Sequence, residues 1–87
     1  MKKVYVLTEM SSGEDCRLSL DQTRVFTTRK VATEKLAMDY NKLIKDISGY
    51  GEITQNVYDG IYYSVILEED DGDTIYEGSI QELDVEY

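Results

Sequence analysis

Among the side chains of this sequence, carboxylates can take part in the widest range of chemistry, and most of them lie in its second half. Residues 46 to 87 hold twelve Asp or Glu and no Lys or Arg, whereas residues 1 to 45 hold six carboxylates and all nine basic residues. Grouped carboxylates can transfer protons, bind cations or attract a basic partner. The densest group, taken with a nearby tyrosine, consists of Tyr62, Glu68, Glu69, Asp70, Asp71, Asp73 and Glu77.

Catalysis by these carboxylates finds little support in the rest of the sequence. There is no histidine, so a Ser-His-Asp or Cys-His arrangement is impossible and general acid–base chemistry lacks its commonest residue. The glycines form no dinucleotide-binding or P-loop pattern. Paired carboxylates could serve a glycosidase, but a chain of 87 residues lacks the walls of a sugar cleft. We therefore expect a protein that is not an enzyme and needs no cofactor.

Metal binding is disfavoured by the residue types and by their spacing. A single cysteine, Cys16, and the absence of histidine exclude the usual Cys/His zinc sites. The acidic run at residues 68 to 73 suggests calcium, but placing Gly72 at the sixth position of an EF-hand loop puts Leu67 first and Gly78 twelfth. Those two positions require carboxylates. The run is better interpreted as the solvated tip of a hairpin without a metal.

The length of the chain predicts one domain spanning residues 1–87. No segment approaches the roughly 20 apolar residues that cross a bilayer. The apolar run after Lys2 and Lys3 ends at Leu7, which is too short for a signal peptide. One unpaired thiol suits a reducing compartment. We expect a cytoplasmic protein that does not bind membranes.

The elements that position the carboxylates begin with two predicted strands. Residues 3 to 8 are β-branched or aromatic on both parities, which is typical of a central strand. Residues 10 to 15 are predicted to form a loop. Residues 16 to 20 alternate between apolar and polar, which predicts a second strand with one wet face, followed by a turn at residues 21 to 23.

One helix is predicted from Thr27 or Thr28, as N-cap, to about Ile47. Ser48 and Gly49 supply a helix end, and Lys42 and Lys45 lie favourably near the negative end of the helix dipole. The apolar face of this helix consists of Ala32, Leu36, Tyr40, Leu43 and Ile47.

The second half predicts a hairpin, with residues 61 to 69 and 74 to 80 flanking a two-residue loop at Asp71 and Gly72. If those two residues form the loop, one face of the hairpin is apolar and becomes the core face. Its cross-strand pairs would be Leu67 with Tyr76, Val65 with Gly78, and Tyr63 with Ile80. The other face would carry Tyr62, Glu68 and Glu77.

Two segments are less regular. Residues 50 to 60 are predicted to form a loop or an irregular edge strand, because tight pairing through Asp59 and Gly60 would place Glu52, Thr54 and Asn56 beside core residues. The alternating tail at residues 82 to 87 predicts a short edge strand. The expected fold class is α+β with the order ββαββ, one amphipathic helix packed on a small, mostly antiparallel sheet.

The net charge of −9 predicts a partner with a basic surface and disfavours direct nucleic-acid binding. One hypothesis is nucleic-acid mimicry, in which rigid carboxylates occupy the phosphate-binding track of another protein. In the predicted register Glu68 and Glu77 are diagonal neighbours about 7 to 8 Å apart, and the acidic residues at the tip extend the array. Tyr62 beside them is either an interface anchor or a cross-strand packing residue.

The alternative hypothesis is an interaction or assembly module. A front half of formal charge +3 and a rear half of −12 would favour a weak homodimer or docking on a basic partner. The acidic surface could also serve only to keep a monomer in solution. A local basic patch leaves direct contact with nucleic acid open, and its members would be Lys2, Lys3, Arg17, Arg24, Arg29 and Lys30.

Two stretches of the first half, residues 4 to 8 and residues 25 to 32, resemble small uncharacterised proteins encoded by phages and mobile elements. Those proteins often open with a similar strand and pass through a V-F-x-[ST]-x-x-x-A junction into a helix, as Val25-Phe26-Thr27-Thr28 and Ala32 do here. The resemblance covers about the first 45 residues and transfers no site residue. It implies a genomic setting in which small acidic inhibitors of host defence nucleases, including anti-CRISPR proteins, are common.

Overall fold

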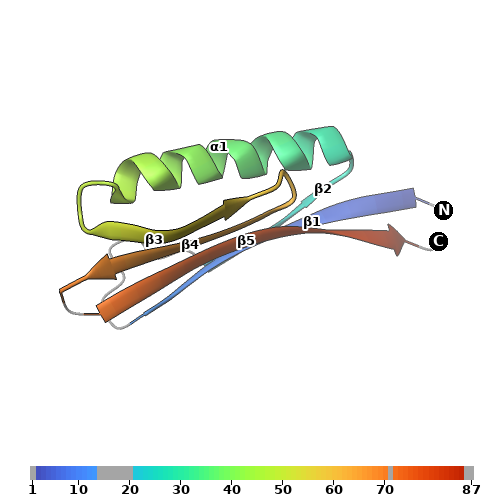
Figure 1. Cartoon of the computed structure of the whole chain (residues 1–87). Helices are drawn as coiled ribbons and strands as arrows, with labels where there is room; N and C mark the ends of the chain where they lie inside the picture. Colours follow the sequence, from blue (N-terminus) through green and yellow to red (C-terminus); the bar gives the residue numbers. More distant parts are fainter. Residues whose placement is uncertain (1, 14–20, 71, 86–87) are drawn as a thin grey trace.

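The computed structural model describes residues 2–13, 21–70 and 72–85, and within them one helix packs on a five-stranded antiparallel sheet (Figure 1). The sheet order is β2-β1-β5-β4-β3. The expected α+β class is confirmed, and the element order is ββαβββ because residues 52 to 58 add a strand. The elements are β1 (Lys2–Gly13), β2 (Asp21–Phe26), α1 (Arg29–Ile47), β3 (Glu52–Tyr58), β4 (Tyr62–Glu69) and β5 (Gly72–Val85).

The centre of the sheet is the antiparallel pair of β1 and β5, which are in register from Lys2 opposite Val85 to Gly13 opposite Thr74. The predicted first strand is correct. The loop predicted over residues 10 to 15 is wrong at residues 10 to 13, and residues 14 and 15 lie outside the described residues. Residues 10 to 13 extend β1 because β5 offers them a continuous hydrogen-bonding edge. The predicted edge strand at the tail is also wrong, since residues 82 to 85 complete the central strand β5.

The edges of the sheet are β2 and β3. The turn predicted at residues 21 to 23 is wrong, because they begin β2, where Thr23 pairs with Thr8 and Gln22 pairs with Glu9. The strand predicted at residues 16 to 20 lies outside the described residues, as does Arg17.

Helix α1 forms as the sequence predicts. The Thr28 side chain caps it by accepting a 3.3 Å hydrogen bond from the Val31 N–H, and the helix ends at Ile47 with Ser48 as C-cap. The predicted apolar face is buried except for Tyr40, which is partly buried. No helix among the described residues is long and apolar enough to cross a membrane.

In the hairpin of β4 and β5 the predicted side chains face the core, but the two strands pair in a different register from the predicted one. Glu69 pairs with Gly72, so the residues between the strands are 70 and 71, and Tyr63 faces Gly78 instead of Ile80. A shift of two residues keeps every side chain on its predicted face, since the side-chain period of a strand is two. The observed register sets the bulky Tyr63 ring opposite the one residue in β5 that has no side chain on that face.

Strand β3 is the irregular edge strand that the sequence predicts as one of two possibilities. Tyr58 and Asn56 pair on the helix side of the sheet with Tyr63 and Val65. A register shift between Ile53 and Gln55 then changes the phase, so that Ile53 pairs with core residue Leu67 and Glu52 moves to the other face. A β-bulge therefore allows β3 to pair tightly from the turn at residues 59 to 60 and still places Ile53, instead of Glu52, beside the core.

The core lies between α1 and one face of the sheet, and no described element covers the opposite face (Figure 1). We call this uncovered side the open face. Strand alternation assigns to it Val4, Val6, Thr8, Met10, Ser12, Thr23, Val25, Glu52, Gln55, Val57, Tyr62, Ser64, Ile66, Glu68, Asp73, Ile75, Glu77, Ser79, Gln81 and Leu83, with Lys2 and Val85 at its end.

Candidate partner-binding face

Most of the acidic residues singled out in the sequence lie at or near the open face. Glu68 and Asp73 are exposed on it, Glu77 is half-buried near its centre, and Tyr62 retains 37% of its accessible surface there. Asp70 is exposed beyond the end of β4. Glu69 has the opposite strand parity and does not lie on this face, and Asp71 lies outside the described residues.

The predicted diagonal pair of Glu68 and Glu77 does not form. In the observed register Glu77 faces Ser64, four residues along β4 from Glu68, which corresponds to about 13 Å. Glu68 instead lies between two other carboxylates, directly opposite Glu52 on one side and Asp73 on the other. We call Glu52, Glu68 and Asp73 the carboxylate row. It crosses β3, β4 and β5, and directly opposed Cβ atoms lie about 4.5 to 5.5 Å apart.

The carboxylate row carries repulsion that the described part of the chain does not offset. Like charges directly opposite one another on a sheet are destabilising. Lys3 pairs with Glu82 and Lys35 pairs with Asp39, and neither of these ion pairs involves the row. The described acidic residues also form no group suited to a metal ion. Neither of these two ion pairs therefore neutralises a carboxylate of the row.

Neutralising the middle of the row should stabilise the isolated protein. We expect Glu68→Gln to raise the free energy of unfolding by about 0.5 to 1 kcal/mol, since it removes two directly opposed repulsions. Urea unfolding at low and high salt measures this, and the gain should shrink as salt screens the charges. Glu34→Gln, on the exposed side of α1, is the matched control and should change little. Equal effects of the two substitutions on the free energy of unfolding would show that repulsion within the row does not destabilise the protein.

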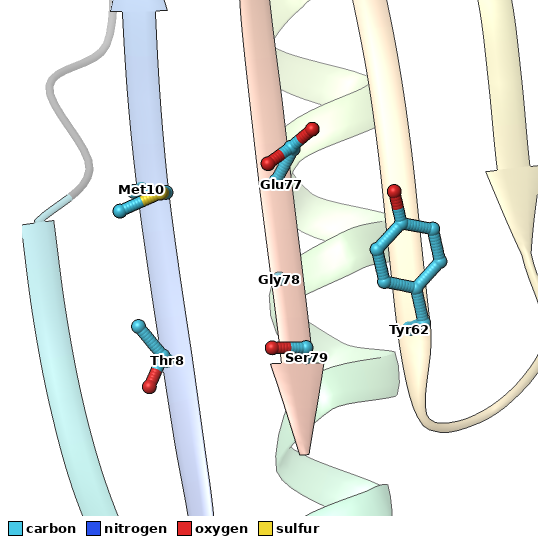
Figure 2. A pocket seen from close by; sticks show the side chains of 6 residues that line it. All are labelled: Thr8, Met10, Tyr62, Glu77, Gly78 and Ser79. Atoms are coloured by element: carbon cyan, nitrogen blue, oxygen red, sulfur yellow. The ribbon is translucent and has the colours of Figure 1, made fainter. Parts of the chain in front are cut away.

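A shallow hollow of about 60 Å³ lies near the centre of the open face (Figure 2). Its walls come from β1, β5 and β4, and Figure 2 shows Tyr62 and Glu77 on neighbouring strands with Met10 and Thr8 on the other side. Ser79, which lies on the open face between Thr8 and Tyr62, leaves room for the hollow because its side chain is short. One carboxylate, one aromatic ring and one thioether therefore border a single small depression.

The open face carries exposed apolar side chains among its polar ones. The large exposed apolar side chains of this face are Met10, Val25, Val57, Tyr62, Ile75 and Leu83. Aromatic and methionine side chains with charged residues at their margin are typical of protein–protein interfaces.

The charge asymmetry of the sequence becomes an asymmetry between layers. Helix α1 carries five basic and three acidic side chains. The described side chains of the open face include four carboxylates, which are the row and Glu77, against Lys2 alone. The two layers therefore project fields of opposite sign.

A second acidic group, which the sequence analysis did not single out, lies on the buried side of the sheet. Glu9 is only 1% exposed, and its two carboxyl oxygens accept hydrogen bonds from Tyr63 Oη at 2.8 Å and Gln22 Nε2 at 3.1 Å. Asp39 on α1 lies beside it and pairs with Lys35 Nζ at 2.9 Å through Oδ1. The available signal was parity, since Glu9 follows Leu7 on the inward side of β1.

Burial governs the protonation of this buried group. Desolvation, followed by the hydrogen bond with Asp39, raises the pKa of Glu9 to about 7. Burial also acts to raise the pKa of Asp39, but the hydrogen bonds with Glu9 and Lys35 outweigh it and hold that pKa below its usual value. Burial and the hydrogen bond with Glu9 raise the pKa of Tyr63.

Comparisons with protein-family models, with curated proteins and with solved structures return no match for this chain.

Proposed function

We propose that this protein is a non-enzymatic binding protein that docks the acidic part of its open face on a basic site of a nucleic-acid-binding protein and excludes nucleic acid from that site. The observation that carries this proposal is the carboxylate row, three opposed negative charges without a cationic partner among the described residues. The resemblance of the first half to phage and mobile-element proteins suggests a host defence nuclease as the class of target, as for anti-CRISPR inhibitors.

The carboxylate row supports mimicry through its density and its rigidity. Three charges held on adjacent strands span about 10 Å, which is comparable to the crowding of phosphates on one nucleic-acid strand. A channel of Lys and Arg that neutralises phosphates would neutralise these carboxylates in the same way. Because the repulsion is already present in the free protein, a basic partner would relieve it on binding.

The hollow supports the same mode of docking by offering a place for one basic side chain of the partner. The aliphatic stem of Lys or Arg would lie along the Tyr62 ring and the Met10 thioether, and its charged end would reach Glu77. Arginine fits this combination best, because it stacks on aromatic rings and pairs with carboxylates. Tyr62 then serves as an interface anchor, and Glu77 pairs with the charged end of the partner's side chain.

A second candidate function is favoured by the exposed apolar side chains of the open face. A face of this kind also suits an assembly module that docks on a basic protein surface unrelated to nucleic acid. Face-to-face self-association is the weaker form of this alternative, since it would bring the central Glu77 of two copies into a shared apolar interface. Competition by nucleic acid separates the two functions.

The test is affinity capture from a native host lysate, with three versions of the protein as bait. The first is the wild type. The second removes the row with Glu52→Gln, Glu68→Gln and Asp73→Asn. The third removes the same number of charges elsewhere, with Glu34→Gln, Asp46→Asn and Asp84→Asn.

The expected result is a nucleic-acid-binding protein that is captured by the wild type and by the charge-matched control, lost with the row variant, and released by duplex DNA or RNA. Each interfacial charge pair contributes on the order of 1 kcal/mol or more, so the row variant should weaken the measured Kd by about 100-fold or more. A partner that nucleic acid does not displace would contradict mimicry and favour the assembly module. Equal binding of both triple variants would contradict a role for the row.

A further inference from the structure

The contact between α1 and the sheet contains an ionisable cluster that the proposed docking does not use. Glu9 on β1, Asp39 on α1 and Tyr63 on β4 meet there, and Gln22 on β2 completes the set. Four elements are therefore joined through one buried carboxyl group. Glu9 has almost no contact with solvent, so it is neither a surface charge nor part of the open face.

The hydrogen bonds that this cluster needs indicate how many protons its two carboxyl groups carry. Asp39 Oδ1 pairs with Lys35, whereas Asp39 Oδ2 is buried and, apart from the neighbouring Glu9 carboxyl, none of the described groups donates a hydrogen bond to it. Leaving a charged oxygen buried without a donor is costly. The group beside it is the Glu9 carboxyl, which can donate only if it carries a proton. A proton on Glu9 would satisfy Asp39 Oδ2 and would leave Glu9 able to accept from Tyr63 and Gln22.

We propose that Glu9 and Asp39 share a single proton in the folded protein, and that loss of this proton loosens the packing of α1 on the sheet. The protonated pair carries one negative charge, which Lys35 balances. Without the proton, the buried carboxylate of Glu9 and the partly buried carboxylate of Asp39 would face one another across the interface between helix and sheet.

The charged groups around the pair do not remove this conflict. From α1 the pair meets Lys35, from β2 it meets Arg24 as a more distant positive charge and Gln22 as a neutral donor, and from β4 it meets the Tyr63 hydroxyl. From β5 the residue directly opposite Glu9 is Gly78, which has no ionisable group. Lys35 already pairs with Asp39, so a second buried carboxylate would lack a cation of its own.

The sign of the pH dependence follows from the two carboxyl groups. The pKa of Glu9 is about 7 in the folded protein against an ordinary value of 4.5, so the folded state keeps a proton that the unfolded state releases. Stability from Glu9 is therefore fully present below about 4.5 and is lost as the pH rises through about 7. Asp39, whose pKa is lowered, contributes in the opposite sense, and its stabilisation is lost only in more acidic solution.

The experiment compares urea unfolding of the wild type and of Glu9→Gln between pH 5 and pH 8. Glutamine imitates the protonated acid, because its amide can donate to Asp39 while its carbonyl oxygen accepts from Tyr63. The other carboxylates are common to both proteins, so their titration cancels in the difference. The unfolding equilibrium constant of the wild type should rise by roughly 50- to 100-fold relative to the variant over this range. Parallel curves would overturn the proposal.

Two further measurements on the wild type keep the proposal testable if Glu9→Gln fails to fold. The side-chain carboxyl carbons of Glu9 and Asp39, followed by NMR, should show Glu9 titrating near neutrality, and titration of Glu9 in its ordinary range would overturn the shared proton. Amide exchange in α1, corrected for the intrinsic effect of pH, should accelerate between pH 6 and pH 8 more than exchange in β1 does. No difference between the two elements would overturn the loosening of the helix.

Discussion

Gly78→Ala is expected to lower the free energy of unfolding by about 2 to 4 kcal/mol. A methyl group at this position would lie 2.2 Å from Cε2 and 2.7 Å from Cζ of the Tyr63 ring. That ring is fully buried between α1 and the sheet and belongs to the core cluster. Any displacement would also break the hydrogen bond from Tyr63 to Glu9 and leave a buried carboxyl without its donor.

The matched control is Gly49→Ala, beyond the end of α1. A methyl group there meets no atom within 4 Å, and the backbone of Gly49 is not in the left-handed region. This change should leave stability within about 0.5 kcal/mol or raise it slightly. Urea unfolding of both variants measures the difference. If alanine were tolerated equally at the two positions, the Tyr63 ring could not lie over Gly78 and the register of β4 on β5 would be wrong.

Tyr40→Ala is expected to lower the free energy of unfolding by about 2 to 3 kcal/mol, since a large, partly buried aromatic side chain is lost. Tyr40 connects α1 to the edge strand β3. Its ring stacks on Tyr58 with centroids 4.5 Å apart and planes 16° apart, and it meets the Tyr63 ring at 5.7 Å. Its hydroxyl donates a hydrogen bond to Asn56 Oδ1.

The control for the ring is Tyr40→Phe, which keeps both aromatic contacts and removes only the hydroxyl. It should cost about 0.5 to 1 kcal/mol. Amide exchange should also distinguish the variants, with exchange in β3 accelerated more than exchange in β1 by Tyr40→Ala. Uniform acceleration in both strands would show that β3 is held to the molecule without Tyr40.

The helix and the core face of the hairpin could be predicted because their signals are local. The Thr28 cap, the apolar spacing from Ala32 to Ile47 and the two-residue period of β4 each lie within a short stretch of chain. The pairing of β1 with β5 could not be predicted in the same way, since it joins residues at opposite ends of the sequence. Apolar alternation shows that a segment is a strand but not which strand lies beside it.

Only those residues of the candidate site whose positions follow from local patterns could be predicted. Exposure of Glu68, Asp73 and Tyr62 follows from the parity of the hairpin. The carboxylate row also needs Glu52, which reaches the open face only because a β-bulge changes the phase of β3. Glu9 was missed because charge counting treats every carboxylate as a surface group, whereas strand parity places this one in the core.

The central position of β5 has a consequence for how the chain acquires its structure. β1 emerges first during synthesis, yet the strand that fills one side of it is made only after the helix and two further strands. Contacts between residues so far apart in sequence carry a large loop-closure cost and slow folding. Until β5 arrives, one edge of the apolar strand β1 has no partner from its own sheet and is open to pairing with other chains. The completion of folding is therefore tied to a late event, the insertion of a strand into the middle of a sheet rather than its addition to an edge.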